Sequence, residues 1–226
     1  MNDSARKFNE NGFAVIAGVV SVSDCDAVAE RVSEVAGQTV GSRNALAYGW
    51  CKSLAVQLRD HGFLAQLRPV PEVAVQCTIF DKSSEKNWLV ALHQDLSIPV
   101  RQRVANAQCT GWTKKEGQLF VQPPVPVVED LVAVRVQLDS CGTDSGPLRV
   151  VPSSHRHGRL SPIAARTLKE RHGEIECLVP KGGVLVMRPL LLHSSSKAKV
   201  PVRRRVLHFL FGPAALPYGL RWQHAI

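Results

Sequence analysis

The spacing of hydrophobic residues along the chain changes at about residue 70. Before that point, apolar residues recur at intervals of three and four, as on one face of a helix. They predict helices over residues 23–36 and about 46–60, the first ended by Gly37. From residue 73 onward, short runs rich in β-branched and aromatic residues dominate, and they indicate strands.

The expected strands are separated by turns rich in glycine and proline. They cover residues 73–80, 88–93, 131–139, 148–151, 183–187 and 202–211. Many short strands with such turns indicate a sandwich or a barrel. One short helix is expected among them over residues 161–171, because Ser161 offers a cap and Pro162 takes the first helical position.

Residues 131–139 alternate between apolar and polar side chains. If the polar face of this strand points into a barrel, it lines a polar interior where a site can lie. Arg135 and Gln137 are then candidate substrate contacts. The same alternation fits a strand whose polar face meets solvent, so both orientations stay open.

Residues 97–130 have no clear periodicity. Prolines and glycines interrupt the segment repeatedly. A long irregular segment is uncommon inside a compact domain unless it is functional, so we expect a loop that covers the substrate. Its candidate substrate contacts are Trp112, Lys114, Lys115 and Gln122. A merely packed insertion is the alternative.

Length and composition bound the class of protein. A chain of 226 residues with 45% hydrophobic and 21% charged residues suits one well-cored domain. We expect a helical support over about residues 1–70 and a β core over about 71–226. The chain start lacks the pattern of a signal peptide, and no stretch approaches the roughly 20 apolar residues of a membrane span. We therefore expect a cytoplasmic protein without a membrane segment.

The six cysteines are spread along the chain without a Cys-x-x-Cys pair. This pattern predicts reduced, mostly buried thiols rather than disulfides or a zinc site. The net charge of +9 is compatible with nucleic acid, an anionic membrane or an acidic small molecule. Because the basic clusters are short and lack interleaved aromatic residues, nucleic-acid binding is disfavoured and an anionic substrate is weakly favoured.

Candidate metal ligands lie in two places, His93-Gln-Asp95 and His193. Positions i and i+2 of a strand point to the same face, so His93 and Asp95 can converge on one ion. Two imidazoles and one carboxylate form the facial triad that binds Fe(II) and leaves three positions open. A hydrogen-bonded pair at a strand end is the alternative for His93 and Asp95. The rival histidine ligands are His155, His157 and His208.

Further motifs surround these ligands. They are Phe80-Asp-Lys82, Asn87-Trp88, Ser145-Gly-Pro-Leu148, Pro152-Ser-Ser-His155 and His193-Ser-Ser195. With them the chain resembles the phytanoyl-CoA dioxygenase family of Fe(II)- and 2-oxoglutarate-dependent oxygenases, from about Phe13 to the C-terminus. The resemblance implies a mainly β fold with flanking helices, a double-stranded β-helix of the jelly-roll or cupin type.

The same resemblance implies roles for individual residues. His93, Asp95 and His193 are the catalytic metal ligands, and Arg204, eleven residues after His193, binds the far carboxylate of 2-oxoglutarate. Guanidinium suits that role because it pairs bidentately and stays charged. Ser195 is expected beside that carboxylate. Two weaker co-substrate candidates are Lys82 and Asn87, for which a surface lysine and a turn asparagine are the alternatives.

The expected reaction is hydroxylation of a small molecule with O2 and 2-oxoglutarate, releasing succinate and CO2. The carboxylate of Asp95 favours hydroxylation over halogenation, because halogenating relatives lack that ligand. A nucleic-acid or protein demethylase of the same chemistry is an alternative, disfavoured by the simple arginine pattern downstream. A catalytically inactive β-barrel binding module is another, disfavoured because all three ligands and Arg204 are present. Leu92, Ser153 and Ala198 depart from the family pattern and put the substrate pocket in doubt. We expect a monomer or a weak homodimer.

Overall fold

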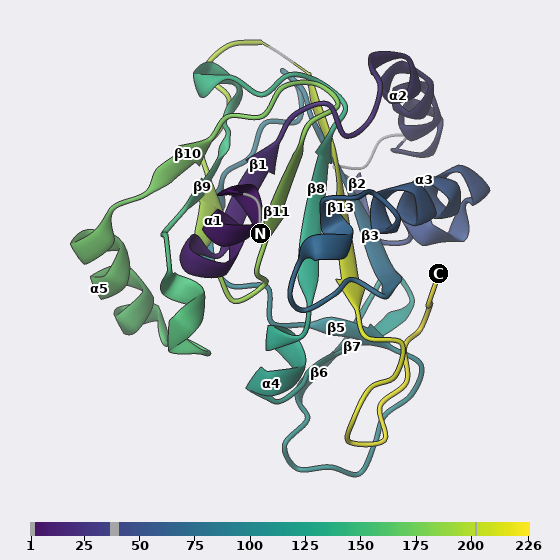
Figure 1. Ribbon diagram of the computed structural model, residues 1–226, viewed down its shortest axis with the longest axis vertical. Coiled ribbons are helices and arrows are strands. Elements are labelled where there is room, and N and C mark those ends of the chain that lie inside the picture. The colour runs from purple at the N-terminus through teal and green to yellow at the C-terminus, as the bar shows by residue number, and fades with distance from the viewer. Residues whose placement is uncertain (1–2, 37–40, 202) are drawn as a thin grey trace.

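The structure is a computed structural model that describes residues 3–36, 41–201 and 203–226. Strands dominate it, with helices mostly on the outside (Figure 1). Two of its sheets contribute side chains to the walls of one cavity, as in a double-stranded β-helix. Within these ranges, every helix is too short or too polar to cross a membrane.

The major sheet has six strands, and every neighbouring pair in it is antiparallel. Its order is β1 (Phe13–Ile16), β11 (Val184–Met187), β8 (Val132–Gln137), β13 (Arg204–Gly212), β3 (Val73–Lys82) and β2 (Gly41–Ser42). Two of these strands, β1 and β2, come from the N-terminal part of the chain, for which the sequence predicted only helices.

Two smaller antiparallel sheets complete the β structure. The minor sheet has the order β10 (Ile175–Cys177), β9 (Leu148–Val150), β12 (His193–Ser195) and β4 (Val90–His93). The third sheet has the order β5 (Ile98–Val100), β7 (Gln118–Gln122) and β6 (Thr110–Lys115).

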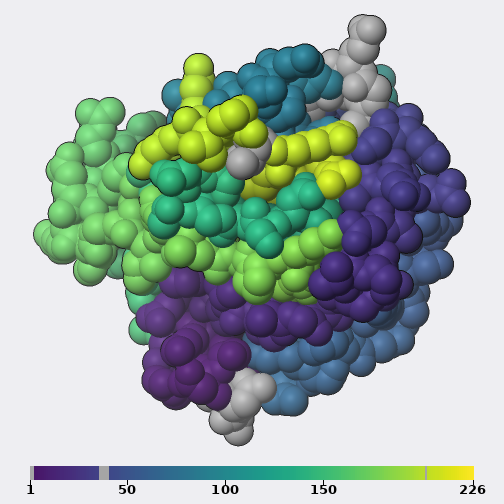
Figure 2. All heavy atoms as spheres, turned by 90° about the horizontal axis from the view of Figure 1, so that it is seen from above, coloured from purple at the N-terminus to yellow at the C-terminus, as the bar shows by residue number. Residues whose placement is uncertain are grey.

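Helices cover the outward face of the major sheet. Of all helices in the described residues, the longer are α1 (Asp3–Asn11), α2 (Val22–Ala36), α3 (Gly49–Arg59) and α5 (Pro162–His172), and the shorter are α4 (Val125–Glu129), η1 (Ala45–Ala47), η2 (Leu64–Gln66), η3 (Thr143–Ser145) and η4 (Ser154–His157). Phe8, Cys25 and Leu54 from the first three helices join one buried core with Leu207 and Phe209 of β13. The segment that contains α5 instead projects from one side of the molecule (Figure 2).

Most of the expected elements are confirmed. All six expected strands and the three expected helices are present. Helix α5 begins as expected, because the Ser161 hydroxyl accepts a hydrogen bond from the Ala164 amide at 3.2 Å. The six cysteines are buried free thiols, as expected. Gly37, which was expected to end α2, lies outside the described residues.

The expectation of an irregular loop over residues 97–130 is wrong. The segment forms the third sheet and α4 instead. Glu116 and Gly117 have φ angles of 49° and 78° and make the two-residue turn of a hairpin. Gly111, with φ of 60°, lies where the register of β6 against β7 shifts, as in a bulge. The glycines that suggested a loop therefore serve the turn and the bulge of a hairpin.

The major sheet turns a polar stripe inward. Alternation along β13 sends Leu207 and Phe209 into the helix-covered core, whereas Arg204 and His208 line the cavity between the sheets. Across the strands, Arg204 lies opposite Lys82, and His208 lies opposite both Thr78 and Arg135. The polar face of residues 131–139 thus points inward at Arg135, and a solvent-facing strand is excluded because all of β8 is buried.

Candidate active site

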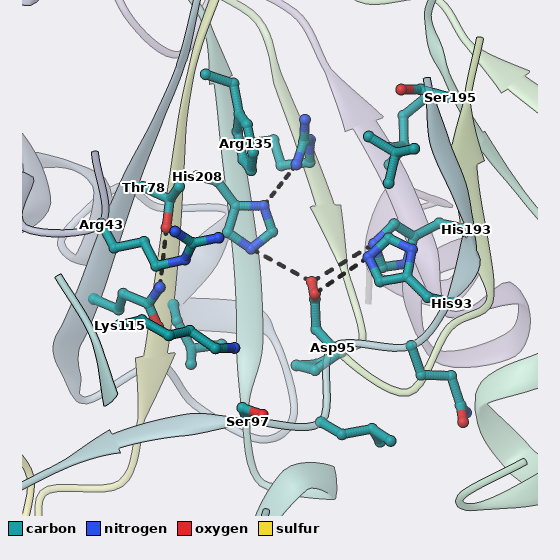
Figure 3. Close-up of a pocket in the computed structure, with 18 of the residues that line it drawn as sticks. Arg43, Thr78, His93, Asp95, Ser97, Lys115, Arg135, His193, Ser195 and His208 are labelled. Carbon is teal, nitrogen blue, oxygen red and sulfur yellow. Dashed lines mark hydrogen bonds and ion pairs between the residues drawn. The ribbon is translucent and has the colours of Figure 1, made fainter. Parts of the chain in front are cut away.

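The main cavity lies between the major and minor sheets, with the third sheet closing part of it. Its volume is about 450 Å³, and its walls come from β3, β13 and β8 on one side and from β4, β12 and β9 on the other. Figure 3 shows histidines and one carboxylate in the centre of this cavity and basic side chains around them.

Three candidate metal ligands meet in the centre of this cavity. His93 at the end of β4 lies directly opposite His193 at the start of β12, with ring centroids 4.2 Å apart. The Nε2 atom of His93 lies 3.7 Å from Asp95 Oδ1, and that of His193 lies 3.7 Å from Asp95 Oδ2. All three ligand atoms lie within 4.8 Å of one another, a spacing at which one ion can contact them all.

Backbone carbonyls fix the tautomers of both histidines. Nδ1 of His93 lies 2.8 Å from the Ala91 carbonyl, and Nδ1 of His193 lies 2.8 Å from the Leu191 carbonyl. Because a carbonyl oxygen only accepts, each Nδ1 carries the proton and each Nε2 presents a lone pair toward Asp95. This arrangement is the one that neutral imidazole ligands use, with the outer nitrogen held by a second hydrogen bond.

The protonation states suit a cation in the centre. Burial lowers the pKa of His193 to about 4, so its imidazole is neutral at pH 7. Burial opposes ionisation of Asp95, but the neighbouring His193, His208 and His93 and the Arg135 guanidinium outweigh it and lower the pKa of this carboxyl group. The centre therefore presents the Asp95 carboxylate and the neutral His193 imidazole beside His93, and these are the residue types of an Fe(II) triad.

Gln94 holds the ligand segment in place. Its side-chain amide donates to the Gly158 carbonyl at 2.8 Å and to the Leu190 carbonyl at 2.6 Å, and its oxygen accepts from the Leu160 amide at 2.9 Å. The Asp95 amide also donates to the Pro189 carbonyl at 2.9 Å. These bonds fix the segment between β4 and the third sheet before any ligand arrives.

His208 also approaches Asp95, but it is not suited to bind metal. Its Nδ1 lies 2.7 Å from Nη1 of Arg135, and its Nε2 lies 3.7 Å from Asp95 Oδ2. Arginine only donates, so Nδ1 is the acceptor and Nε2 carries the proton. Burial, then the charge of Arg135, lowers the pKa of His208 to about 3 and keeps the ring neutral. His208 therefore turns its Nε2–H toward Asp95, at a distance longer than a hydrogen bond.

The other rival histidines lie away from this centre. His155 and His157 are on η4 and are absent from the cavity wall. Among the described residues, only one group of three candidate ligands lies close enough together to hold one ion, and it consists of His93, Asp95 and His193. The rival ligand sets therefore have no support in the geometry.

A second cluster of charged groups, Lys82 and Arg204, lies where β3 ends and β13 begins. Nζ of Lys82 donates to Ser195 Oγ at 3.3 Å and to the Ser196 carbonyl at 3.0 Å. Arg204 is only 3% exposed, and its Nε has no hydrogen-bond partner among the described residues. Burial, then the charges of Arg204 and Arg135, lowers the pKa of Lys82 to about 8. Two adjacent buried cations with an unpartnered donor fit a carboxylate ligand.

The net positive charge of the cavity wall also favours anionic ligands. Lysines and arginines line the cavity at Arg43, Lys82, Lys115, Arg135 and Arg204. Among the described residues that line it, Asp95 is the only acid. Nε of Arg135 is likewise buried without a partner, and burial, then the charge of Arg204, lowers its pKa to about 10. A dianion such as 2-oxoglutarate would compensate part of this positive charge.

Several residues suggested by the sequence lie elsewhere. The Asn87 amide exchanges two hydrogen bonds with the backbone of Ala198, at 2.9 and 2.8 Å, and is not on the cavity wall. Gln137 is buried without lining the cavity, and its Oε1 is unpartnered within the described structure. The Trp112 indole donates to the Cys109 carbonyl at 2.9 Å and packs in a separate apolar cluster. Lys114 is exposed, and neither it nor Gln122 lines the cavity.

The structure adds residues that the sequence did not single out. Gln76 and Thr78 line the cavity on β3, where alternation with Phe80 and Lys82 could have placed them once the inward face was known. Arg43 reaches the cavity from the N-terminal part of the chain. No pattern in the sequence links Arg43 to residues that lie so far along the chain.

Two imidazoles and one carboxylate on the wall of a jelly-roll cavity place the protein among the non-haem iron, 2-oxoglutarate-dependent oxygenases. Comparison with known families makes this assignment more specific. The chain belongs to the phytanoyl-CoA dioxygenase (PhyH) family, which it matches over residues 8–206. This confirms the family and the fold expected from the sequence motifs. No curated protein sequence matches the chain.

Solved structures of similar fold come from the same class of enzyme. SnoK, a non-heme α-ketoglutarate-dependent carbocyclase from nogalamycin biosynthesis, has a TM-score of 0.71 at 15% identity, covering 95% of this chain and 84% of that one. EctD from S. alaskensis with 2-oxoglutarate and 5-hydroxyectoine has a TM-score of 0.68 at 18% identity, covering 95% and 78%. HygX from Streptomyces hygroscopicus with nickel and 2-oxoglutarate bound has a TM-score of 0.64 at 18% identity, covering 94% and 87%. At these identities the likeness shows the fold.

Proposed function

We propose that the protein hydroxylates a small molecule, using Fe(II), O2 and 2-oxoglutarate. The observation that carries the proposal is that the triad and the unpartnered Arg204 lie in one cavity. Iron, when bound, supplies the oxidation: 2-oxoglutarate, O2 and a C–H bond give succinate, CO2 and an alcohol, with one oxygen atom entering each organic product.

The chain holds the metal through the Nε2 atoms of His93 and His193 and a carboxylate oxygen of Asp95. The carbonyls of Ala91 and Leu191 orient the two rings, which keeps both lone pairs directed inward without metal. The Nε2–H of His208 faces the second oxygen of Asp95 from 3.7 Å, so its dipole favours this orientation of the carboxylate. A metal held by these three groups would keep open positions, as in other sites of this ligand set.

The co-substrate is held at its far end by Arg204, Lys82 and Ser195. Arg204 supplies a planar pair of N–H donors for a carboxylate, and Lys82 adds a second positive charge from the neighbouring strand. The Ser195 hydroxyl already accepts from Lys82, so its own proton is available for the carboxylate. Asn87 is not part of this proposal, because Ala198 occupies its amide.

Hydroxylation is proposed over the other oxidations that this fold supports. SnoK is a carbocyclase and SnoN an epimerase, so a similar fold alone does not select the outcome. The carboxylate of Asp95 is present in the triad, which favours hydroxylation over halogenation. The net positive charge of the cavity favours an anionic substrate over a neutral one.

The cysteines and the basic groups bear on the setting of the reaction. The buried free thiols suit a reducing compartment such as the cytoplasm. We propose one catalytic domain that acts there as a monomer or a weak homodimer. Nucleic acid is not proposed as a partner, because Lys82, Arg135 and Arg204 of the cavity are buried rather than part of an open basic surface.

The proposal is tested by anaerobic titration of Fe(II) into the protein with 2-oxoglutarate. The visible band of an Fe(II)–2-oxoglutarate chelate is expected in the wild type. It should be lost in His193→Ala and should need more co-substrate in Arg204→Met. A folded wild-type protein that shows no band would contradict the proposal and favour a binding module without iron chemistry.

A further inference from the structure

Lys115 carries a charge on the cavity wall that neither iron nor 2-oxoglutarate explains. It is half-buried at the end of β6 and lies on the side of Asp95 opposite to His93 and His193 (Figure 3). Within the described residues, no carboxylate lies within ion-pair distance of its ammonium group. That group lies over the ring of Phe120, with Nζ 5.1 Å from the ring centroid. Lys115 is thus a cation directed into the site away from the Lys82 and Arg204 pair.

The hairpin that carries Lys115 is clamped to the N-terminal part of the chain. The Glu116 carboxylate accepts from the Arg43 guanidinium at 2.9 Å, from the Arg43 amide at 2.8 Å and from the Ser42 hydroxyl at 3.0 Å. Gln118 donates to the Asn44 side chain at 2.6 Å. These bonds fix the turn, so the ammonium group is held over the cavity before a ligand binds.

The two nearby cations, Arg43 and Lys115, differ in their ion pairing. Glu116 compensates the charge of Arg43, whereas Lys115 keeps an uncompensated charge. Burial, then the charge of Arg43, lowers the pKa of Lys115, while Asp95 acts in the opposite direction. Nearby, Thr78 Oγ1 accepts from the Gln76 amide at 2.9 Å, so the Thr78 hydroxyl proton is available to a ligand.

The charge of the complete site points the same way. The dication and Asp95 together leave one positive charge, which the dianion of 2-oxoglutarate more than offsets. The remaining charges of Lys82, Arg135, Arg204 and Lys115 still make the loaded cavity strongly positive. A neutral substrate would leave the half-buried Lys115 beside this excess of positive charge without a counter-charge.

We propose that the substrate carries an anionic group, a carboxylate or a phosphate, which Lys115 binds with help from the Thr78 hydroxyl. This rests on the proposed function, since it assigns the second half of the same cavity. The C–H bond to be oxidised then lies between this anionic group and the metal triad. Lys115 is accordingly a specificity-determining residue for an organic acid or a phosphate ester.

The test separates this proposal from the proposed function by adding ligands in two stages. The protein is first saturated anaerobically with Fe(II) and 2-oxoglutarate, and the visible band reports whether that stage succeeds. Sulfate and acetate are then titrated separately by calorimetry against chloride at constant ionic strength, as simple probes of phosphate-like and carboxylate groups. Failure of the first stage overturns the proposed function. Failure of the second alone overturns only the anion subsite.

Two variants on the same strand make the second stage specific. Lys115→Met removes the charge in the cavity, and Lys114→Met removes the same charge from the exposed face of β6. At least one probe should bind the wild type at one site, about tenfold more weakly in Lys115→Met, and within about twofold in Lys114→Met. Lys115→Arg should restore binding. Absence of binding for both probes, or equal losses in the two Met variants, would overturn the proposal.

Discussion

Arg204 is expected to lower the stability of the free protein and to raise its affinity for 2-oxoglutarate. It is 3% exposed, its Nε is unpartnered in the described structure, and its Nη1 donates to Cys141 Sγ at 3.8 Å. Lys82 lies directly opposite on β3, so two cations face each other in a buried place. Arg204→Met keeps most of the length of the side chain and removes the charge.

The two expected effects have opposite signs. An unsatisfied buried polar group costs about 1–3 kcal/mol, so the free variant should unfold at a temperature several degrees higher. Loss of one partner of a buried charge pair costs about 2–5 kcal/mol, so the Kd for 2-oxoglutarate should rise by about 30-fold or more. If Arg204 served only to stabilise the fold, Arg204→Met would neither raise the unfolding temperature nor raise the Kd for 2-oxoglutarate.

Arg205→Met is the matched control. Arg205 is the next residue along β13 and points to the other face, where it pairs with Asp139 at 2.6 and 2.9 Å. The control should destabilise the free protein and leave the affinity for 2-oxoglutarate within about twofold, because its salt bridge is structural. Thermal unfolding and calorimetric titration of 2-oxoglutarate into Fe(II)-loaded protein under anaerobic conditions measure both quantities. An Arg204→Met protein that binds 2-oxoglutarate as tightly as the wild type would refute the assignment.

Three further predictions follow from neighbouring groups. His208→Phe removes the donor facing Asp95 and should weaken metal binding by about 10- to 100-fold, read from Co(II) absorption, whereas unchanged Co(II) affinity would contradict this role. Because the pKa of Lys82 is lowered to about 8, this ammonium group loses its proton as pH rises through that value. The affinity for 2-oxoglutarate should therefore fall above pH 8 in the wild type, and Lys82→Met should abolish that pH dependence rather than keep it. Gly146→Ala would put a methyl group 2.6 Å from the Ser196 carbonyl at a φ of 65°, so it should lower the unfolding free energy by about 1–3 kcal/mol in urea titrations; an unchanged midpoint would contradict the clash.

The proposed metal ligands could be brought together from the sequence because part of their geometry is local. His93 and Asp95 are two residues apart next to a strand, and the pattern of a strand brings both to one face. His193 needed the double-stranded β-helix as well, because only the fold brings β12 beside β4. Arg204 was located by its spacing in the family, and the strand register then placed it opposite Lys82.

Other parts of the site depend on contacts that no local pattern reveals. Arg43 reaches the cavity because Glu116, 73 residues later, binds both its guanidinium and its amide. The hairpin over residues 110–122 was misread because glycines and prolines were taken as signs of a loop, whereas a Glu-Gly turn between β-prone runs also fits a hairpin. Asn87 has the composition of a ligand contact, yet its amide holds the backbone of Ala198.

The most direct test of the central claim is formation of succinate from 2-oxoglutarate under O2 by the Fe(II)-loaded protein. We expect this turnover to proceed slowly even without the organic substrate, so the substrate need not be known. The account predicts succinate that depends on Fe(II) and disappears in Asp95→Ala, with the circular dichroism spectrum of the variant unchanged. Absence of succinate from folded, iron-loaded wild type, or equal amounts from Asp95→Ala, would contradict it.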